Sequence, residues 1–213
     1  MLDERGIYSV IGRVDGACCS RGDMPGRMLS GMRVLGFDLE TTGFNHRTDR
    51  IVQYALVGSD KDGSHIRLQS LVDPGLKIPT EASEVHGISD SDVKGRGEWS
   101  DHLGEIIGLM EGSVVVGHNV IGFDWRFLEM ECLRVGSETP IPLALLDTLV
   151  IARSFGIPGR HRLVDLCDRF GIVAERFHDA EADAGATLLL LWSIMGAYPE
   201  RFNCTIEEFL SNL

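Results

Sequence analysis

Two acidic residues stand two positions apart inside an apolar segment, Phe37-Asp38-Leu39-Glu40. In a β-strand successive side chains point to opposite faces, so Asp38 and Glu40 share one face while Phe37 and Leu39 share the other. Two neighbouring carboxylates at the end of a buried strand are costly unless a positive group lies between them. A divalent cation is the most economical candidate, and the first hypothesis is therefore a metal site.

Two further acidic residues follow in suggestive positions. Asp124 comes just after a loop that leaves an apolar segment at Gly117, and open α/β sheets build their sites where such loops leave the strands. Asp183 lies five residues after His178, at the start of a long apolar helix. Four carboxylates can hold two hard cations about 4 Å apart, which clamp the attacking and leaving oxygens of phosphoester hydrolysis. His178 is then the natural general base, because an unperturbed imidazole has a pKa of about 6.5.

The rest of the chain predicts the elements that position these residues. Apolar alternation and turn residues predict five strands, over residues 33–40, 51–57, 65–72, 113–117 and 143–146. Helical spacing predicts helices over 100–110 with Ser100 as the N-cap, 124–135, a segment after Asp147-Thr148, 162–170, 180–195 and 206–210. Strands first and alternating elements later indicate an α/β fold with a mixed sheet flanked by helices.

Composition limits the classes of protein to consider. A chain of 213 residues with 44% hydrophobic residues can bury one full core. We expect one globular domain over residues 32–213, preceded by an N-terminal extension of unknown structure over residues 1–31. A net charge of −12 excludes a protein that holds nucleic acid through a broad basic surface. A polyanionic substrate would need help from metal ions or from a confined arginine patch.

The cysteines and the apolar segments indicate the compartment. The five cysteines are odd in number and include no CxxC pair, so neither a disulfide framework nor a zinc site is expected. The first thirty residues lack the apolar core of a secretory signal. The longest apolar run falls short of the roughly 18 residues that a membrane span needs. We expect a cytoplasmic protein with no membrane partner.

Several short motifs, taken together, resemble a known enzyme family. They are FDLETTG at 37–43, VHGIS at 85–89, HN and FD within 118–124, LDT at 146–148 and HDAEAD at 178–183. We expect the VHGIS segment to be a loop. The chain resembles the DEDDh 3′→5′ exonucleases, most closely the bacterial DNA polymerase III epsilon (proofreading) group, over roughly residues 33–193. One departure is the three residues between Asn119 and Phe123, where the epsilon-like pattern has two; this spacing resembles the second exonuclease motif of family B polymerases.

The resemblance implies a ribonuclease-H-like fold with a mixed five-stranded sheet and two divalent ions, Mg²⁺ or Mn²⁺. It implies that Asp38 binds both metals, that Glu40 and Asp183 complete the tighter site, that Asp124 holds the second metal and that His178 is the base. By the same resemblance, Thr41, Thr42 and Gly43 receive the 3′-terminal nucleotide, with His86 and Asn119 near its base or phosphate. The implied reaction removes nucleoside 5′-monophosphates from the 3′ end of single-stranded DNA, with a replication or repair polymerase as a partner.

Some of these features also fit other functions, or none. Any one acid of the HDAEAD segment could simply favour the positive end of a helix dipole. A dehalogenase-type phosphatase also begins with an acidic strand end, but it needs a downstream lysine that the chain does not supply in a suitable motif. An RNA 3′-end trimming exoribonuclease on the same scaffold remains open, as does a non-catalytic nucleic-acid-binding module.

Several other residues each have two possible roles. Asp147 is either near the site or the N-cap of the next helix, and His118 and His86 are either packing residues or substrate contacts. The most basic part of the chain contains Arg153, Arg160, Arg162, Arg169 and Arg176. These arginines could follow the phosphates of a single strand, or they could be solvated helix residues paired with Asp165, Asp168 and Glu175.

Overall fold

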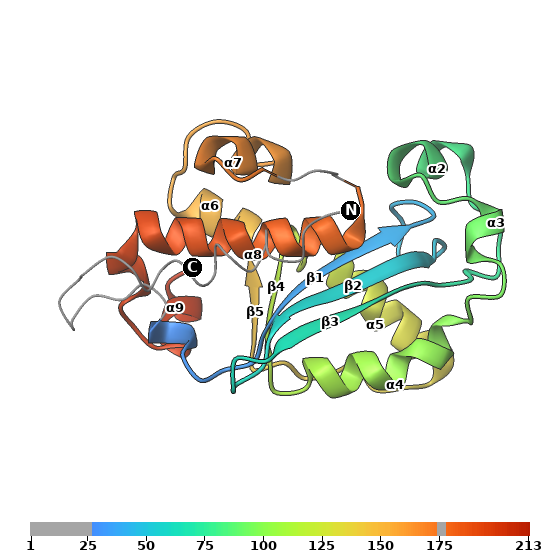
Figure 1. Cartoon of the computed structure of the whole chain (residues 1–213), viewed down its shortest axis with the longest axis horizontal. Helices are drawn as coiled ribbons and strands as arrows, with labels where there is room; N and C mark the ends of the chain where they lie inside the picture. The colour runs from blue at the N-terminus through green and yellow to red at the C-terminus, as the bar shows by residue number, and fades with distance from the viewer. Residues whose placement is uncertain (1–26, 174–177) are drawn as a thin grey trace.

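The computed structural model describes residues 27–173 and 178–213 (Figure 1). The elements in chain order are η2 (Arg27–Leu29), β1 (Val34–Thr41), β2 (Ile51–Ser59), β3 (His65–Leu71), α2 (Thr80–His86), α3 (Asp90–Val93), α4 (Trp99–Met110), β4 (Val114–Gly117), α5 (Asp124–Val135), β5 (Ala144–Asp147), α6 (Thr148–Ser154), α7 (Leu163–Phe170), α8 (Ala180–Ala197), η3 (Pro199–Phe202) and α9 (Ile206–Ser211). Most of the predicted 1–31 extension and Arg176 lie outside the described residues, and the domain boundary stays a prediction.

The five strands form one mixed sheet in the order β3-β2-β1-β4-β5. The pairs β1–β2 and β2–β3 are antiparallel, whereas β1–β4 and β4–β5 are parallel. This confirms the predicted α/β fold with a mixed five-stranded sheet. Because parallel strands end at the same edge of a sheet, β1, β4 and β5 bring Thr41, Gly117 and Asp147 to one edge.

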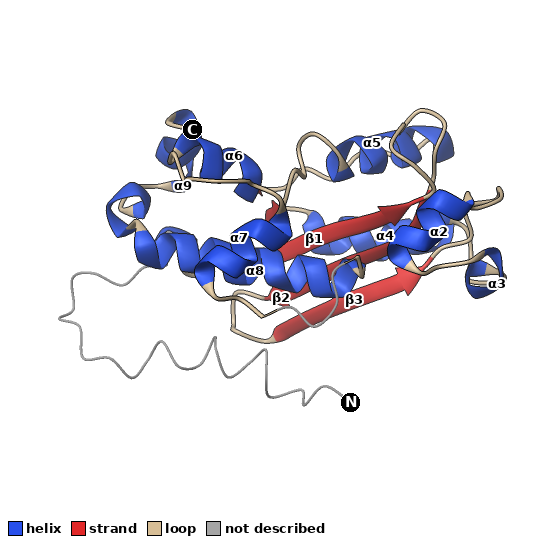
Figure 2. Ribbon diagram, turned by 90° about the horizontal axis from the view of Figure 1, so that it is seen from above, coloured by secondary structure: helices blue, strands red, loops and turns tan. Residues whose placement is uncertain are grey.

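Helices cover both faces of the sheet, as Figure 2 shows. Leu35, Phe37 and Leu39 of β1 point to the face where they pack with residues of α4 and α5. The alternate residues of β1 point to the other face, where α8 crosses the sheet and contacts β1, β2 and β4. The strand therefore uses its apolar positions for one core and leaves Asp38 and Glu40 on the side of α8.

Small residues let α8 approach the sheet closely. A Cβ atom added at Gly36 would lie 2.4 Å from the backbone oxygen of Ala184, so a larger residue cannot fit there without moving the helix. Ala180 and Ala184 of α8 pack on Ala55 of β2, and all three are fully buried. Because Gly36 precedes Asp38 by two positions on the same face, the close approach brings the first turns of α8 towards the acidic end of β1.

Two local predictions were wrong. Helix α4 begins at Trp99 with Glu98 as its N-cap residue, two residues earlier than the predicted Ser100 cap. Trp99 is 1% exposed, and its burial favours inclusion in the helix, while the Glu98 N–H donates to Asp101 Oδ2 at 3.0 Å. The segment 85–89 is not a loop throughout, because α2 includes Val85 and His86 and ends at Gly87 with a left-handed φ of 75°.

In the described part of the chain, no helix combines the length and the apolar character needed to cross a bilayer. The expected cytoplasmic location stays a prediction. Near the start of the described residues, Met28 and Leu29 of η2 are buried in the same core cluster as Phe202 and Phe209 near the C-terminus.

Candidate active site

The acidic end of β1 is the first part of the site. Asp38 pairs with Ala55 of β2 and Glu40 with Gln53, so both carboxylates lie over the antiparallel half of the sheet. On its other side β1 pairs with β4 only from Val34 to Gly36. The strand therefore extends beyond its parallel neighbour, and the backbone N–H of Leu39 is available to a side chain.

The Asp124 side chain accepts a hydrogen bond from that N–H. Its Oδ1 accepts a hydrogen bond from the Leu39 N–H at 3.1 Å, and the residue is 3% exposed at the first position of α5. The three-residue segment before Phe123 folds into a tight turn in which the Asn119 carbonyl accepts the N–H groups of Gly122 and Phe123 at 3.1 and 2.9 Å. The longer spacing is thus absorbed locally, and Asp124 still lies beside Asp38.

Several hydrogen bonds fix the start of α8 over the same region. Gln53 Oε1 accepts the Ala180 N–H at 3.2 Å, which ties the first helical residue to β2 directly opposite Glu40. The Asp179 side chain caps the helix by accepting the Ala182 N–H at 3.2 Å. Glu181 forms an ion pair with Arg67 of β3. Sequence reasoning missed Gln53, because its partner lies 127 positions away along the chain.

His178 and Asp183 complete the cluster. His178 is exposed, has a left-handed φ of 69°, and donates its backbone N–H to Asp183 Oδ2 at 3.0 Å. One ligand atom each from Glu40, His178 and Asp183 lies within 4.8 Å of the other two. The second Asp183 oxygen, Oδ1, is buried and accepts no hydrogen bond from any described residue. A buried carboxylate oxygen without a donor is well suited to a cation.

The crowded carboxylates have raised pKa values. Burial raises the pKa of Asp38 well above its usual range, and the negative charges of Asp124, Asp183 and Glu40 add to the shift. Burial, followed by the charge of Asp183, raises the pKa of Glu40 to about 8. Burial also raises the pKa of Asp124 and of Asp183, although the His178 N–H opposes the shift at Asp183. The cluster therefore needs protons or cations to offset its charge.

Oxygen ligands gathered in this way fit hard divalent cations such as Mg²⁺ or Mn²⁺. Asp38 and Glu40 come from β1, Asp124 from α5 and Asp183 from α8. The structure thus brings all four predicted acidic residues, with His178, to one edge of the sheet. Whether each of them binds metal stays a prediction.

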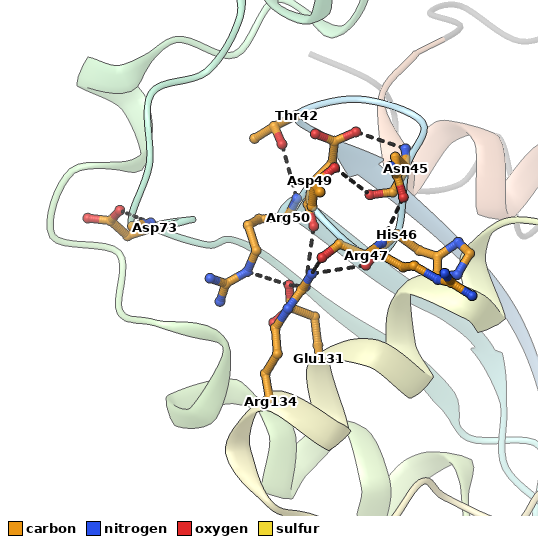
Figure 3. A network of polar contacts seen from close by, with 11 residues as sticks. Thr42, Asn45, His46, Arg47, Asp49, Arg50, Asp73, Glu131 and Arg134 are labelled. Carbon is orange, nitrogen blue, oxygen red and sulfur yellow. Dashed lines mark hydrogen bonds and ion pairs between the residues drawn. The ribbon is translucent and has the colours of Figure 1, made fainter.

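The loop between β1 and β2 is held by a network of polar contacts (Figure 3). The buried Thr42 donates its backbone N–H to the Arg50 carbonyl at 2.9 Å and accepts the Arg50 N–H on Oγ1 at 3.0 Å. Thr41 Oγ1 donates to the Gly43 carbonyl at 2.6 Å. A Cβ at Gly43 would lie 2.4 Å from Asp49 Oδ2. These three predicted substrate residues therefore shape the loop, and their contact with a nucleotide stays a prediction.

Helix α5 anchors this loop from below. Glu131 is 1% exposed, and its Oε1 accepts hydrogen bonds from Arg50 at 2.7 Å and Arg134 at 2.8 Å. Arg134 also donates to the carbonyls of His46 and Arg47 at 3.0 and 2.9 Å (Figure 3). One buried carboxylate and two guanidinium groups thus hold the loop against the helix that begins with Asp124.

An exposed aromatic residue at this loop was missed from the sequence. Phe44 follows Gly43 directly and is 89% exposed, with its ring centroid 6.2 Å from that of Phe123. Exposed aromatic rings are suited to stacking against nucleobases. Its place immediately after the FDLETTG segment was the only sequence signal.

The remaining predicted substrate residues are His86 and Asn119. His86 ends α2, and its Nδ1 accepts the Ile88 N–H at 3.0 Å. Burial lowers the pKa of His86, and the nearby Thr41 backbone opposes this shift while the charge of His178 adds to it. Asn119 is exposed in a left-handed conformation with a φ of 64°. His86 therefore lies close to Thr41 and His178, Asn119 lies in the turn before Asp124, and the substrate contacts of both stay predictions.

Asp147 is the N-cap of α6 and also binds the loop before Asp124. Its carboxylate accepts the N–H groups of Leu149 and Val150 at the start of α6, at 2.9 and 3.4 Å. The same carboxylate accepts the N–H groups of Asn119 at 2.9 Å and Ile121 at 3.2 Å. One side chain thus holds both α6 and the loop that leads to Asp124.

Comparison with known proteins gives matches over most of the chain. The sequence profile of the RNase T exonuclease family matches residues 35–191. The epsilon subunit of DNA polymerase III from Treponema pallidum is 30% identical over 168 residues, covering 78% of this chain and 77% of that protein. A PolC-type DNA polymerase III from Streptococcus suis is 32% identical over 180 residues, covering 84% of this chain and 12% of that polymerase.

The fold is similar to solved structures. E. coli exonuclease I in complex with a dT13 oligonucleotide has a TM-score of 0.70 and 20% sequence identity, over 81% of this chain and 43% of that chain. Exonuclease I from Methylocaldum szegediense has a TM-score of 0.67 at 23% identity, over 81% of this chain and 42% of that chain. At these identities the likeness supports the fold alone.

Proposed function

Because the chain belongs to the RNase T exonuclease family, we propose that it hydrolyses single-stranded DNA from the 3′ end and releases nucleoside 5′-monophosphates. The observation that carries the proposal is the cluster in which Glu40, His178 and Asp183 offer ligand atoms within 4.8 Å of one another, beside Asp38.

The proposal assigns two divalent ions, Mg²⁺ or Mn²⁺, to Asp38, Glu40, Asp124 and Asp183. It is supported by the raised pKa values of these four carboxyl groups and by the buried Asp183 oxygen without a donor. When bound, such a pair of ions lowers the pKa of water and offsets the negative charge on the phosphate. The protein contributes rigid ligands, since β1, α5 and α8 are tied together through Leu39, Gln53 and Gly36.

His178 is proposed as the general base. Its side chain is exposed at the entrance of the cluster, where it can take a proton from the attacking water and pass it to solvent. The backbone N–H of His178 bonds to Asp183, so the same six-residue segment orients the base and one carboxylate.

The substrate end is proposed to lie against the β1–β2 loop. Thr41, Thr42 and Gly43 would bound the terminal nucleotide, the exposed Phe44 ring offers a stacking surface for a base, and His86 and Asn119 flank it. DNA is preferred over RNA because the similar proteins are named as DNA polymerase III subunits and as an exonuclease bound to dT13. On the same similarity, a replication or repair polymerase is proposed as a partner.

The test is digestion of matched DNA and RNA oligonucleotides, single-stranded and duplex, each labelled at the 5′ end or at the 3′ end. We expect Mg²⁺ or Mn²⁺ to support stepwise shortening of single-stranded DNA from its 3′ end, and a chelator to stop it. Asp183→Asn should abolish the reaction, whereas Glu138→Gln, an equal change at an exposed loop residue, should leave it intact. Faster digestion of RNA would assign the enzyme to RNA trimming, and no hydrolysis of either polymer would contradict the proposal.

A further inference from the structure

A group of arginines lies on α6, on α7 and on the loop between them. Arg153 is in the last turn of α6, Arg160 is in the loop, and Arg169 is in the last turn of α7. All three are exposed in a chain whose net charge is −12. We call these three residues the α6–α7 arginine surface.

The described residues offset these charges only in part: the pKa of Asp165, lowered chiefly by its hydrogen bond from Arg162, is also lowered by the charge of Arg160. Within the described ranges none of the three forms an ion pair, whereas Arg162 in the same segment pairs with Asp165, its Nε 2.6 Å from Oδ2. Proximity to a helix C-terminus stabilises a cation and is sufficient reason for Arg153 and for Arg169 taken singly. It does not explain Arg160, which lies in no helix.

The fold also places the guanidinium of Arg169 next to the loop that carries Arg160. A Cβ added at Gly159 would lie 2.7 Å from Nη2 of Arg169, so the guanidinium of α7 packs on the loop residue that precedes Arg160. Gly159 has a left-handed φ of 93°, a conformation that glycine adopts without strain. Arg160 and Arg169 therefore lie on adjacent segments of the same surface.

The surface is joined to the candidate active site. His118 directly follows β4 and precedes Asn119; its Nε2 lies 2.9 Å from the carbonyl oxygen of His161 and its Nδ1 lies 2.8 Å from Oγ1 of Thr148. The loop that carries Arg160 is therefore fastened to the sheet edge where Asp124 lies. Burial lowers the pKa of His118, and the charge of Arg153 adds to this shift, as expected for a cation close to that edge.

We propose that the α6–α7 arginine surface binds the phosphate backbone of the single strand on the 5′ side of the nucleotide that is being removed. The inference rests on the proposed function and extends it: the acidic cluster would receive the terminal phosphate, and the arginines would hold the preceding phosphates. Backbone contacts of this kind carry no sequence preference, which suits an enzyme that moves along a strand.

The test measures binding apart from hydrolysis. Affinity for a fluorescein-labelled dT16 strand is measured in Ca²⁺ in place of Mg²⁺, from about 50 to about 200 mM KCl, because each phosphate contact adds about 0.7 to the salt slope of a single strand. The variants are Arg153→Gln, Arg160→Gln and Arg169→Gln, singly and combined. Lys61→Gln is the matched control, since Lys61 is exposed in the β2–β3 turn, by the opposite end of β1. Thermal melts establish that each variant is folded.

The slope is that of the logarithm of the dT16 affinity against the logarithm of the salt concentration, and we expect it to be smaller by about 2 in the triple variant. Over this salt range the affinity of the wild type should therefore fall about 20-fold more than that of the variant. The triple Arg→Lys variant should restore the slope, and Lys61→Gln should keep it. An unchanged salt slope in the triple variant would overturn the inference. Binding to polyglutamate, an acidic polypeptide, is measured in parallel, and a triple variant that loses binding to polyglutamate but keeps binding to dT16 would also overturn it. If the chain binds dT16 through these arginines but cleaves no DNA, the result would contradict the proposed function and not the role of the arginines in binding the strand.

Discussion

Glu40 provides the sharpest test of the charged cluster, because its effect on stability can be worked out from its pKa. Burial and the charge of Asp183 raise that pKa from 4.5 to about 8. Between these values the folded chain binds a proton that the unfolded chain has released, so the free energy of unfolding falls as the pH rises. The full shift corresponds to about 5 kcal/mol, at about 1.4 kcal/mol for each pKa unit.

The measurable effect is smaller, because Glu40 is only half-buried and its environment relaxes. We expect Glu40→Gln to raise the free energy of unfolding by about 2 to 3 kcal/mol at pH 8 in the presence of a chelator. At pH 5 the difference should nearly vanish, since the folded wild type is then protonated at Glu40. Adding Mg²⁺ at pH 8 should stabilise the wild type more than the variant, because ligand binding to the folded state raises stability.

Urea denaturation followed by circular dichroism measures these differences, with Glu138→Gln as an exposed control that should show none. The difference between wild type and Glu40→Gln isolates one carboxylate, although burial also raises the pKa of Asp38, Asp124 and Asp183. A Glu40→Gln variant that is no more stable than the wild type at pH 8 in chelator would refute the reasoning.

Three other substitutions test how the site is positioned. Gly36→Ala should destabilise the fold by about 3 kcal/mol and lower activity about 100-fold, because the new Cβ would meet a carbonyl of α8 at 2.4 Å. The control is Gly104→Ala, whose new Cβ meets no atom within 4 Å and which should not lower stability in urea denaturation. Arg134→Ala should cost about 3 kcal/mol in the same assay, because it leaves the buried Glu131 with a single cation, and a cost below 1 kcal/mol would contradict that role. Asp147→Ala should weaken activation by Mn²⁺ in a titration of exonuclease rate, because four N–H groups lose their acceptor; an unchanged activation midpoint would count against it.

The sequence was sufficient for features that depend on local patterns. The five strands and the long helices were predicted because hydrophobic alternation and helical spacing are local properties. Asp38 and Glu40 could be placed on one face for the same reason. The mixed sheet was predicted because strands come first along the chain and strands alternate with helices later.

Contacts between distant segments could not be predicted in the same way. Gln53 caps α8 across 127 positions, and Arg134 reaches the carbonyl of His46 across 88. The N-cap of α4 was misplaced because serine propensity was weighed without the burial of Trp99. In each case the deciding interaction is tertiary, and single-residue preferences carry no information about it.

The central claim is that four carboxylates from three elements hold two divalent ions, and calorimetric titration with Mn²⁺ at pH 8 tests it most directly. We predict that the wild type and Glu138→Gln bind two Mn²⁺ ions per chain and that Asp124→Asn, which removes a ligand assigned to one ion alone, binds one. A wild type that binds no Mn²⁺, or an Asp124→Asn variant that still binds two ions with unchanged affinity, would contradict the account.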